Sequence, residues 1–151
     1  MGEPLTHPLR VRYSECDQQG VVFNAHYLAW FDINVTELWR SAFGSYQSAV
    51  ERGVDVVVAA AELRFRASAR FDEVVQLEVA VSHLGTTSII TEHAVTRGGV
   101  RLVEGTLRHV MVDARTLAKT PIPEWFRAGL APWTMPEAAK RASDGALPSS
   151  P

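Results

Sequence analysis

One long helical pattern limits what this chain can fold into. Between Asn24 and Phe43, apolar side chains recur at spacings of three and four residues. About 20 residues at ~1.5 Å each give a helix roughly 30 Å long, the width of a small domain. Asn24 is the expected N-cap and Gly44 the expected stop. The predicted apolar face consists of Leu28, Phe31, Val35, Leu38, Trp39 and Ala42, and Tyr27 and Trp30 widen it. A face this wide needs more than one neighbour to bury it.

The remainder of the chain supplies strands. Apolar and polar residues alternate over residues 9–13, and again in four runs between Val54 and Asp113, with a hairpin signal at residues 97–99. We expect an irregular connection at residues 45–53 and a short helix at residues 124–130. Strands that follow one helix through short loops indicate an α+β domain with an antiparallel sheet. A curved sheet of about five strands wrapped around one long central helix buries both partners. This arrangement is the hot-dog fold.

Composition and charge exclude several classes of protein. The 151 residues predict one domain at 9–130, after a loose lead at 1–8 and before a flexible tail at 131–151. A net charge of −2, with both signs interspersed, argues against a nucleic-acid binder. No run approaches the ~20 apolar residues of a membrane span, and residues 1–10 lack the apolar core of a secretory signal. The single cysteine, Cys16, excludes an intrachain disulfide and fits a reducing cytosol. We therefore expect a cytoplasmic protein.

Asp17 is the first candidate for chemistry. It lies in a polar turn that ends at Gly20, and the long helix begins a few residues later. A carboxylate beside the positive end of a helix dipole favours chemistry on a polarised carbonyl group. The alternative is an ordinary turn aspartate that caps local backbone N–H groups. Apolar residues between the turn and the helix, 21–23, favour the first interpretation because they make a dry site plausible.

In this stretch the chain resembles the acyl-CoA thioesterases of the 4-hydroxybenzoyl-CoA thioesterase type, including the branch associated with the Tol-Pal envelope system. The shared pattern is a Tyr, an Asp four residues later, a Gly, an apolar pair, an aromatic residue and a helix start with a Tyr. Here these are Tyr13, Asp17, Gly20, Val21, Val22, Phe23 and Tyr27. Residues 69–78, the Leu84-Gly85 turn, residues 105–113 and residues 121–123 also fit, so the resemblance covers roughly residues 9–127.

The chain departs from the family at several of these positions. Many relatives have His where this chain has Asn24, so an auxiliary role proposed for that His does not carry over. Others have Thr at Cys16, Pro at Ser68 or Arg at Val35. His26 lies two residues after Asn24, and whether it substitutes for the missing His stays open. Cys16 has no His–Asn arrangement around it, so small buried filler is the preferred interpretation for this thiol.

The resemblance implies a thioesterase that hydrolyses an aromatic or a short to medium aliphatic acyl-CoA to free acid and coenzyme A. Asp17 would act as nucleophile or general base, and the backbone N–H of Asn24 would supply the oxyanion hole at the helix N-terminus. Tyr13 would line the acyl pocket or hold Asp17, with an inward strand aromatic as the alternative. The substrate-binding candidates are Gly20, Val21, His26, Tyr27, Thr86, Thr87, Ser88, Arg64 and Arg70; each of the last five has an ordinary structural alternative.

The resemblance also implies a homo-oligomer. Hot-dog protomers of this family pair edge to edge through their sheets and form their sites at the interface, so we expect a dimer or a homotetramer built from dimers. No cofactor is implied beyond coenzyme A as part of the substrate, and the dispersed His83, His93 and His109 predict no metal site.

Three other functions remain to be weighed. An acyl-carrier-protein thioesterase would use the same chemistry on a different carrier, and a non-enzymatic module would only bind acyl-CoA. A hydratase or dehydratase of this fold is disfavoured, because the fifth residue after Asp17 is Val22 where those enzymes carry His. Their His-Phe-Pro-Gly segment is also missing.

Overall fold

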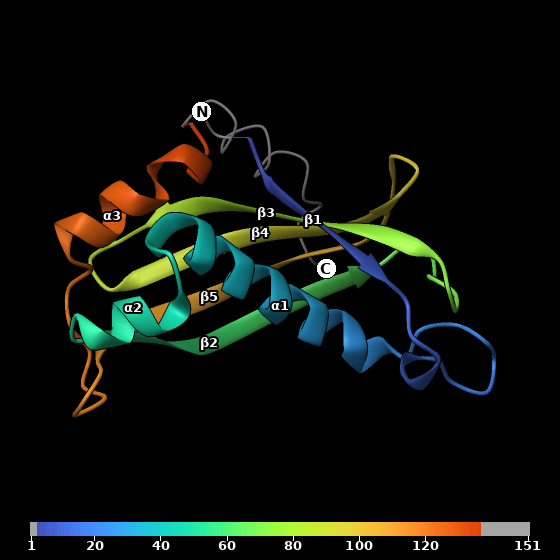
Figure 1. Cartoon of the computed structure of the whole chain (residues 1–151), viewed down its shortest axis with the longest axis horizontal. Helices are drawn as coiled ribbons and strands as arrows, with labels where there is room; N and C mark the ends of the chain where they lie inside the picture. Colours follow the sequence, from blue (N-terminus) through green and yellow to red (C-terminus); the bar gives the residue numbers. More distant parts are fainter. Residues whose placement is uncertain (1–2, 137–151) are drawn as a thin grey trace, which may run out of the picture.

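A five-stranded antiparallel sheet wraps around one long helix in the computed structural model, which describes residues 3–136 (Figure 1). The strand order is β1-β3-β4-β5-β2, so that β1 and β2 form the two edges. The predicted α+β class and hot-dog architecture are confirmed. In chain order the elements are β1 (Leu5–Arg10), the 3₁₀ helix η1 (Tyr13–Glu15), α1 (Asn24–Phe43), α2 (Tyr46–Glu51), β2 (Val54–Phe65), β3 (Val74–Leu84), β4 (Ser88–Arg97), β5 (Val100–Asp113), α3 (Glu124–Leu130) and the 3₁₀ helix η2 (Ala131–Trp133).

The central helix α1 has the predicted bounds, and Gly44 ends it with a φ of 86° that favours glycine. Most of its predicted apolar face is buried, and Trp30 and Leu38 are completely inaccessible. Leu28 is an exception, because 41% of its surface is exposed. It shares a flank of the helix with Trp39, whose ring lies 5.3 Å from that of Phe126 in α3. The helix α3 covers only the C-terminal end of α1, so Leu28 at the other end stays open (Figure 1).

Three segments predicted to be irregular are ordered. Strand β1 begins inside the expected loose lead and pairs with β3 from Leu5, opposite Val79. The connection at residues 45–53 contains α2, whose N-cap Ser45 accepts a hydrogen bond from the N–H of Ser48. The expected tail begins with η2, and Thr134 then forms a bridge beside Val81. Short polar stretches concealed these elements because pairing and capping, rather than apolar periodicity, stabilise them. The rest of the expected flexible tail, from residue 137, lies outside the described residues.

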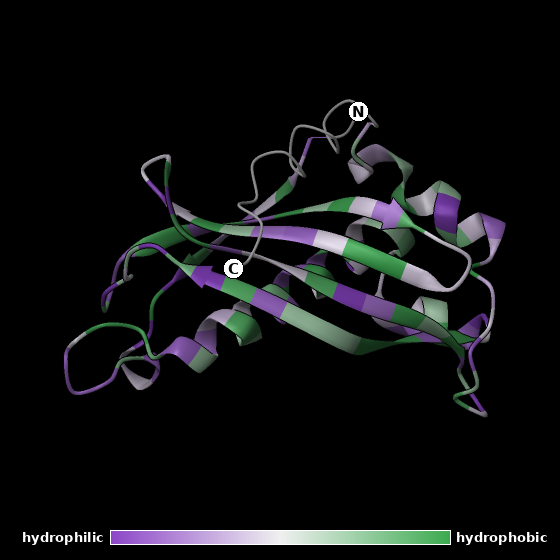
Figure 2. Ribbon diagram, turned by 180° about the vertical axis from the view of Figure 1, so that it is seen from behind, coloured by the Kyte–Doolittle hydropathy of each residue, from purple (hydrophilic) through white to green (hydrophobic). Residues whose placement is uncertain are grey.

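The two edges of the sheet differ in character. The edge strand β1 is short and contains Pro8, which has no backbone N–H to offer a further strand. The edge strand β2 is longer, and Figure 2 shows apolar colouring over most of its length. Two of its apolar side chains, Val57 and Val58, are 43% and 52% exposed. An exposed apolar edge of this kind is a surface for pairing with another strand.

Several polar side chains lie in the core beneath α1. Asn34 is buried without a hydrogen-bond partner for either amide atom, and the Nδ1 atoms of His93 and His109 also have none among the described residues. The ring of His93 stacks on Phe31 at 4.5 Å, and its Nε2 lies 2.8 Å from the hydroxyl of Thr91. Burial, followed by the charge of His109, lowers the pKa of His93 to about 3. Burial also lowers the pKa of His109, against a smaller opposite effect of Asp32. Both imidazoles are therefore neutral in the folded protein near pH 7.

These histidines predict a loss of stability in mild acid. Below the ordinary His pKa of about 6.5, the unfolded chain binds protons that the folded chain excludes. The free energy of unfolding should therefore fall by up to ~1.4 kcal/mol per pH unit for each histidine. Thermal melting between about pH 7.5 and 5 should show a falling Tm, and a smaller fall for His93→Gln. The exposed His83 provides the control, since His83→Gln should keep the wild-type dependence. A His93→Gln variant with an unchanged pH dependence would contradict the assignment.

Candidate functional site

A small hairpin carries Asp17 to the start of α1. The N–H of Phe23 donates to the carbonyl oxygen of Glu15 at 2.9 Å, and the N–H of Asp17 donates to that of Val21 at 2.9 Å. The N–H of Gly20 donates to the carbonyl oxygen of Asp17 at 3.0 Å and closes the turn. Gly20 has a φ of 78°, a backbone conformation that L side chains rarely adopt. The hairpin ends at Phe23, so the carboxylate and the helix start belong to one short, hydrogen-bonded unit.

The carboxylate of Asp17 is half-buried and partly engaged by its own turn. Its Oδ1 accepts a hydrogen bond from the N–H of Gln19 at 2.8 Å. This is the local capping contact that the alternative interpretation of Asp17 predicted. Among the described residues, Oδ2 accepts no hydrogen bond, so one oxygen holds the turn while the other remains available to a ligand.

The N-terminus of α1 offers uncapped backbone donors. The N-cap is Phe23 rather than the expected Asn24, and it provides no side-chain cap. Asn24 is the first helical residue, because the chain leaves the hairpin in extended conformation at Phe23. The first N–H groups of a helix have no partner within it, and they lie at the positive end of the helix dipole. The N–H of Asn24 is therefore suited to bind a carbonyl oxygen or an anion.

Several other predicted residues lie around this unit. Val21 forms a bridge with Arg70, and the N–H of Val22 donates to the carbonyl oxygen of Ala69 at 2.9 Å. Tyr27 is a core residue whose hydroxyl accepts from the N–H of Ala69 at 3.0 Å. Burial raises the pKa of Tyr27, so its hydroxyl stays protonated near neutral pH. These contacts attach the hairpin and α1 to the loop before β3.

Tyr13 and His26 lie on the outside of the same region. Tyr13 belongs to η1 rather than to a strand and is 79% exposed, so the alternative of an inward strand aromatic is wrong for this protomer. Its ring lies 5.7 Å from that of Phe71. His26 is half-buried, and its ring lies 6.3 Å from that of Phe23. Cys16 is also only half-buried and donates a weak hydrogen bond from Sγ to the carbonyl oxygen of Arg12 at 3.8 Å.

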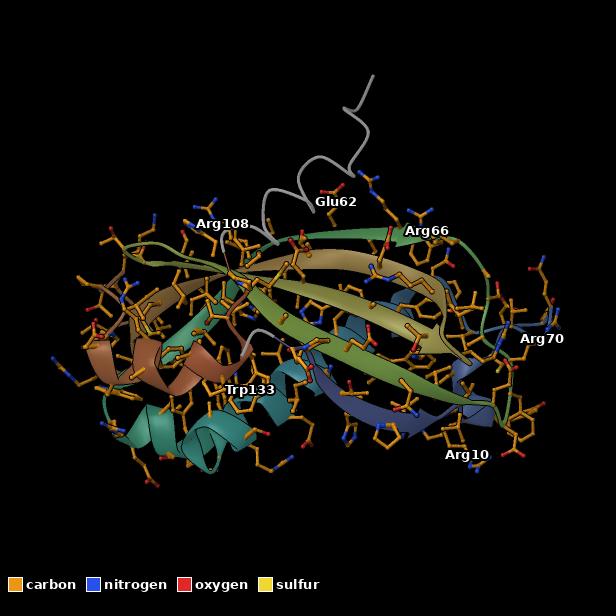
Figure 3. The ribbon with its side chains drawn as sticks, turned by 90° about the horizontal axis from the view of Figure 1, so that it is seen from above. Arg10, Glu62, Arg66, Arg70, Arg108 and Trp133 are labelled. Atoms are coloured by element: carbon orange, nitrogen blue, oxygen red, sulfur yellow. The ribbon has the colours of Figure 1, made fainter. Side chains whose placement is uncertain are left out.

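The remaining predicted residues do not all join the site within one protomer. Arg64 lies near the end of β2, 3.5 Å from Glu62, and Arg70 also lies at the Asp17 end of the molecule. Thr86, Thr87 and Ser88 lie at the opposite end, where Ser88 accepts a hydrogen bond from Arg108 at 3.1 Å. Figure 3 shows Arg70 and Arg108 toward opposite ends of the sheet. At ~3.3 Å per residue, strand pairing separates Ser88 from the level of Phe65 by roughly 23 Å.

Two features at the Asp17 end of the molecule were not predicted from the sequence. Four aromatic side chains, here called the aromatic rim, are more than half exposed: Tyr13, Phe23, Phe65 and Phe71. Exposed apolar groups that gather in one region mark a site for a ligand or a partner. The second feature is Glu15, which is only 2% exposed although it is charged. A glutamate in a short polar segment gives no sequence signal of burial, because its buried partners come from a distant part of the chain.

Neither a metal centre nor a membrane helix is found in the described part of the chain. Within residues 3–136, no group of three or more His, Cys, Asp or Glu side chains is placed to hold a metal ion. No helix in that range is long and apolar enough to cross a membrane.

Comparison with known proteins gives consistent matches. A family model described as the thioesterase-like superfamily matches residues 11–130. An acyl-CoA thioester hydrolase of Escherichia coli O6:H1 is 28% identical over 118 residues, which are 78% of this chain and 88% of that protein. A 4-hydroxybenzoyl-CoA thioesterase of Pseudomonas sp. (strain CBS-3) is 27% identical over 116 residues, 68% of this chain and 78% of that protein. The crystal structure of a hypothetical protein from Thermus thermophilus is 32% identical with a TM-score of 0.78, covering 85% of this chain and 98% of that one.

Removal of one hydroxyl tests the attachment of α1 to the loop before β3. Tyr27→Phe leaves the buried N–H of Ala69 without its acceptor, which should cost about 1–3 kcal/mol of unfolding free energy. Chemical denaturation measures this change. Tyr13→Phe, which alters an exposed ring, should leave the unfolding free energy within ~0.5 kcal/mol of wild type. Equal stability of the two variants would show that the hydroxyl of Tyr27 does not fasten the loop.

Proposed function

This chain belongs to the thioesterase-like superfamily, and we propose that it hydrolyses the thioester bond of an acyl-CoA to give a free acid and coenzyme A. The hairpin that joins Asp17 to the uncapped N-terminus of α1 is the observation that supports this proposal most strongly. It joins in one unit a carboxylate that could act on the carbonyl carbon of a thioester and a backbone donor that could bind the carbonyl oxygen.

The N–H of Asn24 acts on the carbonyl oxygen. As the carbonyl carbon becomes tetrahedral, negative charge develops on that oxygen and accepts the hydrogen bond. The helix dipole adds to the stabilisation, and no side-chain donor has to be reorganised. Donors of this kind are typically worth about 10²–10³ in rate.

Asp17 acts on the carbonyl carbon by one of two routes. In the first, Oδ2 attacks the carbon, coenzyme A leaves as its thiolate and takes up a proton, and water then cleaves the resulting anhydride. In the second, the carboxylate takes a proton from a water molecule whose oxygen attacks the carbon, and the proton passes to the departing thiolate. Both routes consume one water molecule and yield the acid and free coenzyme A.

The acyl group is expected to be aromatic or aliphatic and short to medium in length. The aromatic rim supports this choice, since its rings are exposed at the same end as Asp17 and are able to stack on an acyl group. One of the curated relatives is named for an aromatic thioester. His26 and Arg70 complete the candidate binding residues at this end, and the positive charge of Arg70 would attract coenzyme A phosphates.

The direct test is release of free thiol from a panel of aliphatic and aromatic acyl-CoAs. Asp17→Asn keeps an oxygen for the N–H of Gln19 but lacks the carboxylate, so it should lose about 10²–10⁴ in kcat. Asp72→Asn is the matched control, because it is exposed and its φ of 67° suits Asn. Full activity of Asp17→Asn would overturn the assignment. Hydrolysis of acyl carrier protein thioesters alone would identify the carrier as a protein, and binding without turnover would indicate a binding module.

We further propose that two copies pair through β2. The inner faces of its two halves are apolar, and the bulge between Val58 and Ala60 keeps both halves facing α1. When β2 is paired antiparallel with a second β2 about its midpoint, residues opposite each other share a face. The apolar pairs are then Val54 with Phe65, Val56 with Leu63, and Val58 with Ala61. On the outer face Asp55 meets Arg64, so the strand is complementary in charge to itself.

This pairing would also complete the site. The two-fold axis carries the Thr86–Ser88 end of the second copy to the end of the first copy that holds Asp17. The three polar residues, which lie far from Asp17 in one protomer, then become candidates to contact the pantetheine arm across the interface. Pairing of such dimers would give the expected tetramer.

Charge reversal tests the register of β2. Asp55→Arg and Arg64→Asp should each weaken the dimer about tenfold, because symmetry makes each change twice, and the double variant should recover. Sedimentation equilibrium measures the dissociation constants. Arg101→Asp is the control, since Arg101 lies on β5 and not on the edge strand β2. If the wild-type protein has the mass of one chain, the proposed dimer is wrong. If the double variant dissociates as readily as the single variants, the proposed β2 register is wrong.

A further inference from the structure

We infer that Glu15 is a positioning residue for the proposed reaction: it fixes the hairpin of Asp17 against α1 without touching the substrate. The inference rests on the proposed function. It concerns a buried carboxylate two residues before Asp17 whose contacts run away from the site and into the side of α1.

The contacts of Glu15 come from three parts of the chain. Its Oε2 accepts a hydrogen bond from the indole N–H of Trp30, in the second turn of α1, at 2.6 Å. Its Oε1 accepts from the backbone N–H of Arg12 at 2.8 Å, before η1. Its backbone carbonyl accepts from the N–H of Phe23, which precedes α1. Glu15 therefore connects the base of the hairpin to both the start and the side of the same helix.

The carboxylate is charged in spite of its burial. Burial by itself raises the pKa of Glu15, but hydrogen bonds from Arg12 and Trp30 and the charge of Arg12 outweigh it, so the pKa lies below its ordinary value. The guanidinium of Arg12 lies 3.3 Å from Oε2 and is itself exposed. An ionised acceptor makes stronger hydrogen bonds than a neutral one, which makes this a rigid tie rather than a loose contact.

The Glu15–Trp30 hydrogen bond helps to set the distance between the carboxylate of Asp17 and the N–H of Asn24. Asp17 is held to the hairpin by backbone hydrogen bonds, and the hairpin is held to α1 at Phe23 and at Trp30. Trp30 is completely buried and its ring packs at 5.1 Å against that of Tyr27, so the anchor on the helix is itself fixed. Without the Glu15–Trp30 bond, no side chain of the hairpin would be bonded to the side of α1, and the carboxylate would be oriented relative to the N–H of Asn24 by backbone contacts at the hairpin base and with the loop before β3. A displacement of ~1 Å between reacting groups costs about 10²-fold in rate.

A purely structural role for Glu15 would predict a different outcome. In that case Glu15→Gln would lower Tm but leave the turnover of the folded protein unchanged. A positioning role predicts a fall in kcat with KM nearly constant, measured well below the Tm of each variant. The two roles are therefore separated by kinetics at constant folded fraction.

The experiment compares Glu15→Gln, Trp30→Phe and their double variant with a core variant, Leu130→Ala. Leu130 is completely buried at the end of α3, which covers the C-terminal end of α1 and lies away from both Asp17 and the β2 edge (Figure 1), so its truncation lowers stability away from the proposed site. Glu15→Gln and Trp30→Phe should each lose about 10- to 100-fold in kcat with KM within ~2-fold of wild type. The double variant should lose no more than the worse single variant, because both remove one tie. Leu130→Ala should keep its kcat.

Each outcome bears on one proposal. If Glu15→Gln does not fold, Trp30→Phe removes the same hydrogen bond while keeping a smaller aromatic ring at that position, and its kcat decides. Wild-type kcat in that variant, together with an inactive Asp17→Asn, would overturn the positioning role alone. Full activity of Asp17→Asn would overturn the proposed function itself, whatever the Glu15 variants do. Loss of kcat in Leu130→Ala equal to that of Glu15→Gln would show that general destabilisation explains the effect.

Discussion

Burial of α1 is the constraint on which the rest of the structure depends. The wide apolar face of this 20-residue helix has no stable place in water, and one flat sheet face would leave part of it exposed. The five strands therefore curve around it, and the N-terminus of the helix is brought to one end of the sheet (Figure 1). The same side chains that bury the helix also fasten the hairpin there, because Trp30 binds Glu15 and Tyr27 binds the loop at Ala69. The geometry of the candidate site thus follows from packing of the core.

The two ends of α1 differ in how far neighbouring side chains cover them. At the C-terminal end, rings from α1 and α3 pack on one another, with Phe43 and Phe126 at 4.6 Å, and Arg52 lies 3.6 Å above the ring of Trp125. At the N-terminal end, the aromatic rim remains exposed and the helix has no side-chain cap. Uncapped N–H groups and exposed rings are unfavourable in an isolated domain. Their concentration beside Asp17 is consistent with a site that a thioester and a second copy of the chain complete.

The sequence was sufficient for the architecture and for the place of Asp17. Periodicity marked α1 and four of the strands because these elements bury one regular face, and the bounds of α1 agree with the structure. The sequence was insufficient where capping, strand pairing or contacts between distant residues stabilise an element. Capping stabilises α2 through Ser45, so this helix gave no apolar period. The alternation over residues 9–13 overlaps β1 only at its last two residues, because pairing with β3 starts at Leu5 and the chain turns into η1 at Tyr13. Leu28 had the right spacing but no neighbour to cover it. Glu15 could not be found, because its burial depends on Trp30, which is distant in the chain. The family resemblance grouped Thr86–Ser88 with Asp17, but in one chain they lie at opposite ends of the sheet. In the proposed dimer, Thr86–Ser88 of the second copy would lie near Asp17 of the first.

The proline in β1 has a consequence for how far assembly proceeds. A sheet with two equally good edges would add strands at both and grow into a fibre. Here one edge, β2, is long and apolar, whereas the other is interrupted by Pro8, and beyond Leu5 the side of β3 is occupied by Thr134 and Met135. The proposed pairing through β2 would leave, at the ends of the combined sheet, the two edges least able to accept another strand. Growth by strand addition would then stop at a closed pair, and the apolar β2 edge would be kept out of solution.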